Sequence, residues 1–153
     1  MTYPVSYVNA PVLAGERGVA VSLTTSTEPA TWRNTVRVHL SLTDGSQITV
    51  GGTVTGPRSV QRLVEIDGFE IDVPVSEHVA FLRYTDRPGV VGAAGRLLGD
   101  AGINIAGMQV SRDEAGGQAL IALTVDSAIP AEVLASVAAE IGAVSARSVD
   151  LEL

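Results

Sequence analysis

Hydrophobic residues recur at two different spacings along this chain, and the spacing changes near its middle. Residues 36–42 place Val or Leu at every second position, which is typical of a strand with one buried face. Asp44-Gly45 is a hairpin signal, and the apolar alternation continues after it on a returning strand. A second hairpin is predicted to turn at Asp67-Gly68. The first half therefore predicts a mostly antiparallel sheet.

Two further elements are expected ahead of this sheet. A short helix is predicted from Asn9 to Gly18, because Asn9 can cap it and Pro11 suits an early helical position. Val19–Thr25 alternates as a strand does, and Ser26–Asn34 is polar and turn-rich. The sequence thus predicts one helix and one strand before the hairpins.

After residues 74–77 the pattern becomes strand, helix, strand, strand, helix, strand. The expected strands are 78–84, 103–111, 119–125 and 144–151, and the expected helices are 88–101 and 130–141. This order is the ferredoxin-like βαββαβ unit, which places both helices on one face of a sheet. We therefore predict an α+β fold, with a mostly antiparallel α/β domain over 1–75 and a ferredoxin-like domain over 76–153.

Composition excludes several classes of function. The formal net charge is −7, so a nucleic-acid partner is not expected. All ten basic residues are Arg, which removes lysine chemistry, and the absence of Cys removes thiolate and disulfide chemistry. No export signal and no bilayer-length apolar run is visible, so we expect a cytoplasmic protein without a membrane partner. No metal site is expected, because His78 has no second His or Cys nearby.

Catalysis is not expected of this chain either. A dinucleotide-binding glycine motif after a strand is missing, since Gly89, Gly92 and Gly95 have the wrong spacing and lie in the predicted helix. We therefore expect no NAD or other cofactor in this chain.

The segment 83–107 carries the candidate chemistry. The predicted helix opens at a proline, so its first free N–H groups favour an anion such as a carboxylate, while a neighbouring carboxylate favours an ammonium group. The turn after the first strand is expected to lie beside the start of the second strand, where a carboxamide and a tyrosine complete a site for a small amino acid. The candidate effector-binding residues are Tyr84, Asp86, Pro88, Gly89, Val90, Val91 and Asn104.

Local structure offers a competing explanation for the same residues. Asp86 can be a simple helix cap, and Asn104, just past a glycine, can simply close a turn. Glycines at 92, 95 and 99 lower helix propensity, which close approach of the helix to the sheet or to another subunit would offset. Compositional bias is the alternative explanation for these glycines.

The motif Tyr84-x-Asp86-Arg87-Pro88-Gly89-x-x-Gly92, with the segment 97–106, resembles the ACT domain of D-3-phosphoglycerate dehydrogenase. The first half resembles the intervening domain of that enzyme at 7–11, 16–18, 50–54 and 62–69. This resemblance implies L-serine binding between two subunits, with feedback inhibition of serine biosynthesis. It assigns Tyr84 and Asp86 to one subunit and Asn104 to its partner, in a homodimer or higher oligomer.

The resemblance also places the catalytic, NAD-binding domains outside this chain, in a longer enzyme. Some intervening domains bind an anion through basic residues, and Arg62 keeps one of them, whereas Glu70 and Pro74 replace others. Alternative hypotheses are an oligomerisation module without a ligand, a freestanding amino-acid sensor, and the regulatory part of an enzyme similar to serine dehydratase.

Overall fold

The computed structural model describes residues 5–27, 31–32 and 34–152. Its contacts divide the chain into two compact units, one over residues 1–30 and the other over residues 31–153. The predicted domain boundary between residues 75 and 76 falls inside the second unit, between its two sheets, and stays a prediction. No helix of the described residues is long and apolar enough to cross a membrane.

The first unit contains the predicted short helix but lacks the predicted strand. Helix α1 (Ala10–Glu16) begins after Asn9, whose Oδ1 accepts the Ser6 N–H at 2.6 Å. The prediction of a strand over Val19–Thr25 is wrong, because the chain there has no regular structure and Leu23 is 90% exposed. Alternation alone does not make a strand, since the backbone also needs a pairing partner, and the described part of this unit offers only a helix.

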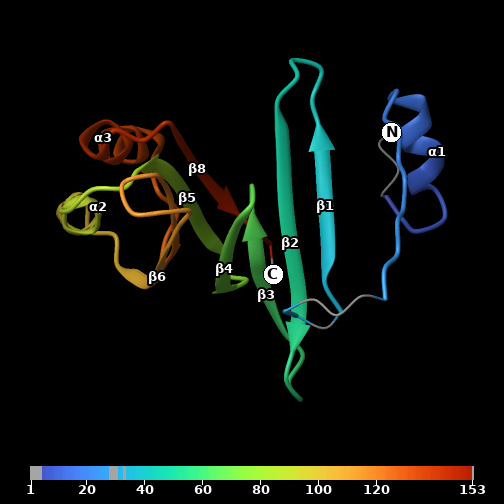
Figure 1. The fold of residues 1–153 in the computed structure, drawn as a ribbon, viewed down its shortest axis with the longest axis horizontal. Helices are drawn as coiled ribbons and strands as arrows, with labels where there is room; N and C mark the ends of the chain where they lie inside the picture. The colour runs from blue at the N-terminus through green and yellow to red at the C-terminus, as the bar shows by residue number, and fades with distance from the viewer. Residues whose placement is uncertain (1–4, 28–30, 33, 153) are drawn as a thin grey trace. The chain divides into compact units, whose positions relative to one another are not determined.

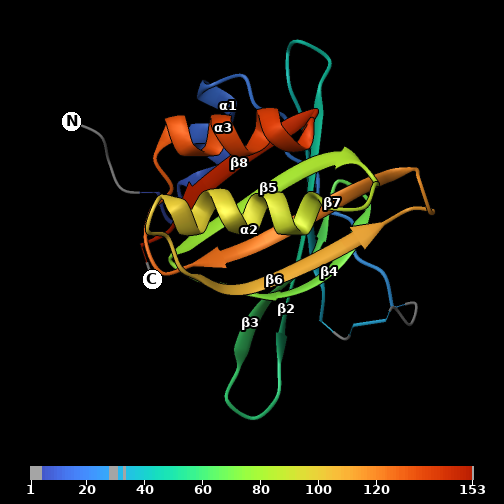
Figure 2. The same ribbon diagram turned by 90° about the vertical axis from the view of Figure 1, so that its left-hand side faces the viewer.

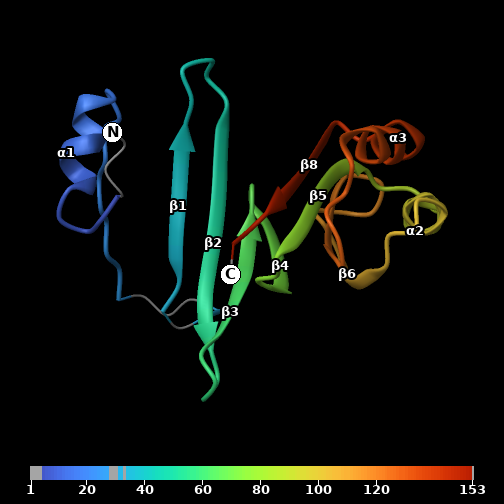
Figure 3. The same ribbon diagram turned by 180° about the vertical axis from the view of Figure 1, so that it is seen from behind.

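The second unit begins with an antiparallel sheet of four strands in sequence order (Figures 1 and 3). Its strands are β1 (Val36–Ser41), β2 (Gln47–Thr55), β3 (Val60–Ile66) and β4 (Phe69–Pro74). The predicted turn at Asp67-Gly68 is confirmed, and both residues have positive φ, 48° and 86°. Positive φ at both central positions suits the right-handed twist of the paired strands, which is why an Asp-Gly pair is favoured here.

The remaining elements form the predicted ferredoxin-like unit. They are β5 (His78–Thr85), α2 (Val90–Asp100), β6 (Ile105–Arg112), β7 (Gln118–Val125), α3 (Ala131–Ile141) and β8 (Ser145–Asp150). The strands pair antiparallel in the order β6-β7-β5-β8, and Figure 2 shows α2 and α3 on the same face of this sheet. The α+β fold class and the βαββαβ order are therefore confirmed.

Strand β7 is buried on both faces, and this joins the two sheets of the unit. On one face, Ile121 and Leu123 pack with helix residues such as Leu98 in the larger core cluster. On the other face, Leu120 and Ala122 pack in a second cluster, together with three residues of the first sheet: Ile66, Ile71 and Val73. A strand covered on both sides reads as a continuous apolar run, as residues 119–123 do.

Helix α2 begins later than its proline suggested. The prediction of a start at Pro88 is wrong, because Gly89 has φ +90° and is the residue before the first helical position, Val90. A φ in this region is left-handed and interrupts the helix, so the Arg87-Pro88-Gly89 segment forms a turn. A Cβ added at Gly92, Gly95 or Gly99 would meet nothing within 4 Å, so close approach to the sheet does not explain these glycines.

Candidate functional site

Asp86 stands at the end of β5 and is held by the hairpin between β6 and β7. Its Oδ2 accepts a hydrogen bond from Arg112 Nη1 at 3.1 Å and a long one from the Gly116 N–H at 3.4 Å. Its own N–H donates to the Gly117 carbonyl oxygen at 2.8 Å. Helix α2 has no side-chain cap, so the interpretation of Asp86 as a helix cap is wrong.

Tyr84, on β5, precedes Asp86 by two positions and belongs to the core. Its side chain is 1% exposed and packs in the larger cluster between the sheet and the helices. Burial raises the pKa of the Tyr84 phenol, the charge of Asp86 raises it further, and the charge of Arg112 lowers it. Tyr84 therefore forms a wall of the region and stays protonated at neutral pH.

The first turn of α2 begins in the loop that follows Asp86. The first intrahelical bond runs from the Ala93 N–H to the Gly89 carbonyl oxygen at 2.9 Å. The N–H groups of Gly89, Val90 and Val91 precede it, so they are the donors that a helix start offers to an anion. Pro88 and Gly89 are exposed in the adjoining turn, whereas the Val90 side chain is buried.

Asn104 lies at the opposite end of the sheet from Asp86. Both β5 and β6 run antiparallel to β7, so the end of β5 lies level with the end of β6. Helix α2, with 11 residues, separates the two side chains by about 16 Å of helix length. The expectation that Asp86 and Asn104 converge within one chain is therefore wrong. Asn104 Nδ2 instead donates to Asp126 Oδ2 at 2.6 Å.

Arg62, the candidate for an anion site, is paired within the first sheet. Its Nε donates to the Asp72 carboxylate and its Nη2 to the Asp72 carbonyl oxygen at 3.1 Å. The guanidinium is thus neutralised by a neighbour on β4, which leaves little support for an anion site there. Among the described residues, no group of three or more acidic or His side chains is placed to hold a metal ion.

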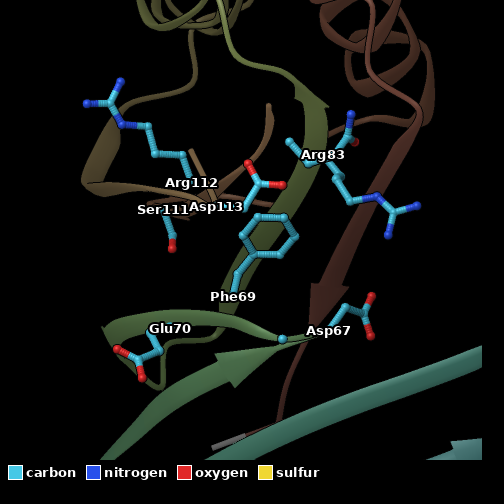
Figure 4. A pocket seen from close by; sticks show the side chains of 9 residues that line it. Asp67, Phe69, Glu70, Arg83, Ser111, Arg112 and Asp113 are labelled. Atoms are coloured by element: carbon cyan, nitrogen blue, oxygen red, sulfur yellow. The ribbon is translucent and has the colours of Figure 1, made fainter. Parts of the chain in front are cut away.

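A cavity of about 680 Å³ lies between the β3–β4 turn and the ferredoxin-like sheet (Figure 4). It is lined by Asp67, Gly68, Phe69, Glu70, Arg83, Ser111, Arg112, Asp113 and Gln118. Its lining includes none of the seven predicted effector residues, although Arg112 links it to Asp86. The predicted effector residues therefore lie in two groups at opposite ends of the sheet, and none of them lines this pocket.

Sequence reasoning missed the two partners of Asp86. Arg112 and Gly116 follow Asp86 by 26 and 30 positions, and only the pairing of β5 with β7 brings their hairpin to it. The available signal was the pair of successive strands predicted at 103–111 and 119–125, together with the ferredoxin-like strand order. That order places the β6–β7 turn at the same end of the sheet as the end of β5.

Comparison with known proteins agrees with this architecture. The family model of the ACT domain matches residues 78–142, and that of the D-3-phosphoglycerate dehydrogenase intervening domain matches residues 1–67. The chain is 39% identical over 147 residues to a D-3-phosphoglycerate dehydrogenase of Mycobacterium leprae (strain TN). It is 40% identical to that of Mycobacterium tuberculosis (strain ATCC 25618 / H37Rv) and 37% identical to that of Bacillus subtilis (strain 168).

These matches cover 96% of this chain and 28% of each of the three relatives. In this chain the match to the intervening domain precedes the match to the ACT domain, and ACT domains generally bind amino acids. The chain therefore corresponds to a regulatory region that carries a D-3-phosphoglycerate dehydrogenase intervening domain followed by an ACT domain.

Proposed function

We propose that this chain binds a small free amino acid, with L-serine as the first candidate, at a site shared by two ACT domains. Binding there would inhibit a D-3-phosphoglycerate dehydrogenase as the end product of its pathway. In this proposal the dehydrogenase reaction and its NAD belong to catalytic domains outside this chain. L-serine is the effector that the family resemblance implies, and the chemistry of the site fits it.

One observation carries the proposal, namely the separation of the polar residues between the two ends of α2. Asp86 and the helix start offer partners for an ammonium and a carboxylate, and Asn104 at the far end offers a donor and an acceptor. A single amino acid of the size of serine cannot bridge the length of the helix. A second copy of the chain is therefore required to complete the site.

The sheet supplies a geometry in which a second copy does this. Strand β6 is the last strand of the order β6-β7-β5-β8, so within the described residues no further strand pairs with its outer edge. Antiparallel pairing of β6 with its copy across a two-fold axis sets the start of one β6 beside the end of the other. Asn104 of one chain then approaches Arg112 and Asp86 of its partner, twice in each dimer.

Isothermal titration calorimetry with L-serine tests the proposal on the intact chain. We expect heat of binding in the wild type and its loss in Asp86→Ala and in Asn104→Ala. Asp100→Ala is a matched control, because Asp100 is an exposed carboxylate on α2 that pairs with Arg96. An absence of both heat and thermal shift at millimolar L-serine would refute the proposal, and titrations with glycine, alanine and threonine would identify a different effector.

A second candidate is an assembly module without a ligand. It is favoured by the bonds of Asp86, because Arg112 and Gly116 already satisfy its Oδ2 within the chain. In that case the chain dimerises to the same extent with and without amino acids. Analytical ultracentrifugation of wild type and Asp86→Ala, each with and without L-serine, separates this candidate from the first.

A further inference from the structure

Arg112 already occupies the position that the proposed function gives to the ammonium group of an effector. Its Nη1 lies 3.1 Å from Asp86 Oδ2, which is the contact that an amino group would make with this carboxylate. The Asp86 side chain is 19% exposed and the Arg112 side chain 59% exposed. The carboxylate is thus largely enclosed, whereas the cation that neutralises it stands mostly in solvent.

The position of Asp86 does not depend on this guanidinium. The Asp86 N–H donates to the Gly117 carbonyl oxygen at 2.8 Å, and the Gly116 N–H reaches Oδ2 at 3.4 Å. The β6–β7 ladder continues to the pair Arg112–Ala119, so the backbone at position 112 is fixed by strand pairing. The Arg112 side chain can therefore leave the carboxylate while the hairpin and Asp86 stay in place.

We propose that Arg112 is an internal counter-ion that the ammonium group of the effector displaces from Asp86. This inference rests on the proposed function. The guanidinium occupies Oδ2, and two cations at this one oxygen repel each other, so an ammonium group that takes Oδ2 requires the guanidinium to leave. An ion pair whose cation is mostly exposed is weak, which makes this exchange possible at a small cost in affinity. Arg112 thereby sets both the affinity and the selectivity of the site.

The selectivity follows from charge balance. An effector with an ammonium group replaces one cation at Asp86 by another, so the carboxylate stays neutralised throughout. A hydroxy acid of the same size, such as glycerate, brings no cation and cannot displace Arg112. Without Arg112, the bare carboxylate of Asp86 would repel such an anion, so loss of the guanidinium acts in opposite directions on the two ligands.

Calorimetry on the full chain with L-serine and with glycerate tests this inference in Arg112→Gln, Arg112→Lys and Arg96→Gln. Arg112→Gln should bind L-serine about two- to fivefold more tightly, the range of an exposed ion pair, and should bind glycerate no better than the wild type does. Arg112→Lys keeps a cation and should resemble the wild type. Arg96→Gln is the control, because Arg96 pairs with Asp100 and Glu140 instead.

If the wild type binds L-serine and Arg112→Gln binds it equally or more weakly, the inference is overturned. The proposed function then still stands. No L-serine binding by either protein overturns both. Should Arg112→Gln fail to fold, the Arg112 side-chain N–H signal in nuclear magnetic resonance spectra of the wild type decides. Displacement predicts that L-serine shifts this signal and that glycerate does not, and an unmoved signal at saturating L-serine refutes it.

Discussion

A mixture of two inactive variants should recover amino-acid binding if the site is shared between two chains. Asp86→Ala removes the ammonium partner from one half of the site, and Asn104→Ala removes the carboxamide from the other half. In a dimer that contains one chain of each variant, one of the two sites is intact and the other lacks both residues. With random assortment, half of the dimers are mixed, so about one quarter of all sites are intact.

Both variants should fold, because each substitution removes interactions that contribute little to stability. Asp86→Ala removes an ion pair whose Arg112 side chain is 59% exposed, which costs about 0.2–1 kcal/mol of unfolding free energy. Asn104→Ala removes an exposed hydrogen bond to Asp126, which costs about 0.5–1.5 kcal/mol. These losses are small beside the stability of an ordinary domain, about 5–15 kcal/mol.

The assay is calorimetric titration of the co-expressed variants with L-serine. We expect each variant alone to bind nothing, and the mixture to bind with a stoichiometry of about one quarter of that of the wild type. Circular dichroism of each protein controls for folding. A mixture that binds no more than its components would place both residues in the same half of the site and refute the pairing of β6 edges.

Three further perturbations test the fold around the site. Leu98→Ala, at 1% exposure in α2, should lower the unfolding free energy in urea by about 2–5 kcal/mol, whereas Val91→Ala, at 47% exposure, should change it by less than about 0.5 kcal/mol. Equal losses would contradict the packing of this helix. Gly89→Ala should lower the unfolding free energy by about 1 kcal/mol or more, because Gly89 has φ +90°. Gly95→Ala should raise it by up to about 1 kcal/mol, because a Cβ added at this helical position meets nothing within 4 Å. If thermal unfolding shows that Gly95→Ala is less stable than the wild type, another subunit approaches the helix closely at this position. Burial, and after it the charge of Asp86, raises the pKa of Tyr84 in the folded state. The protonated phenol therefore contributes its full stabilisation below the unfolded pKa of about 10, and this contribution is lost as pH rises through the folded pKa. Tyr84→Phe should remove this loss of unfolding free energy at alkaline pH, which denaturant unfolding at a series of pH values measures. An unchanged pH profile would contradict the raised pKa of Tyr84.

Much of the fold could be predicted because its signals are local. The turn at Asp67-Gly68 and the order of strands and helices after residue 77 follow from turn chemistry and apolar spacing, and the structure agrees with both. The strand expected at Val19–Thr25 failed because pairing depends on a partner elsewhere, which alternation cannot reveal. The start of α2 failed for a related reason. Pro88 is compatible with both a helix and a turn, and the left-handed φ of Gly89 selects the turn.

Local patterns in the sequence identify the residues of the site, whereas their arrangement follows only from the strand order of the ferredoxin-like unit. Asp86 and Asn104 are 18 positions apart, with a turn and helix α2 between them, and this separation in the sequence does not say whether the two side chains meet. Strand direction decides between these outcomes, because β5 and β6 are both antiparallel to β7 and thus parallel to one another. The contact of Asp86 with Arg112 depends on the same pairing, so neither was visible in local patterns.

In the proposed function, the buried strand β7 would connect binding at Asp86 to the first sheet. The turn that holds Asp86 leads directly into β7, and Leu120 and Ala122 of β7 pack against Ile71 and Val73 of the first sheet. Because this contact is close-packed, a shift of the turn would be expected to move the packed elements with it. Linkage sets the size of the effect. The coupling free energy equals the difference in effector affinity between two arrangements, typically about 1–3 kcal/mol, and any partner that holds the first sheet must alter effector affinity by the same factor.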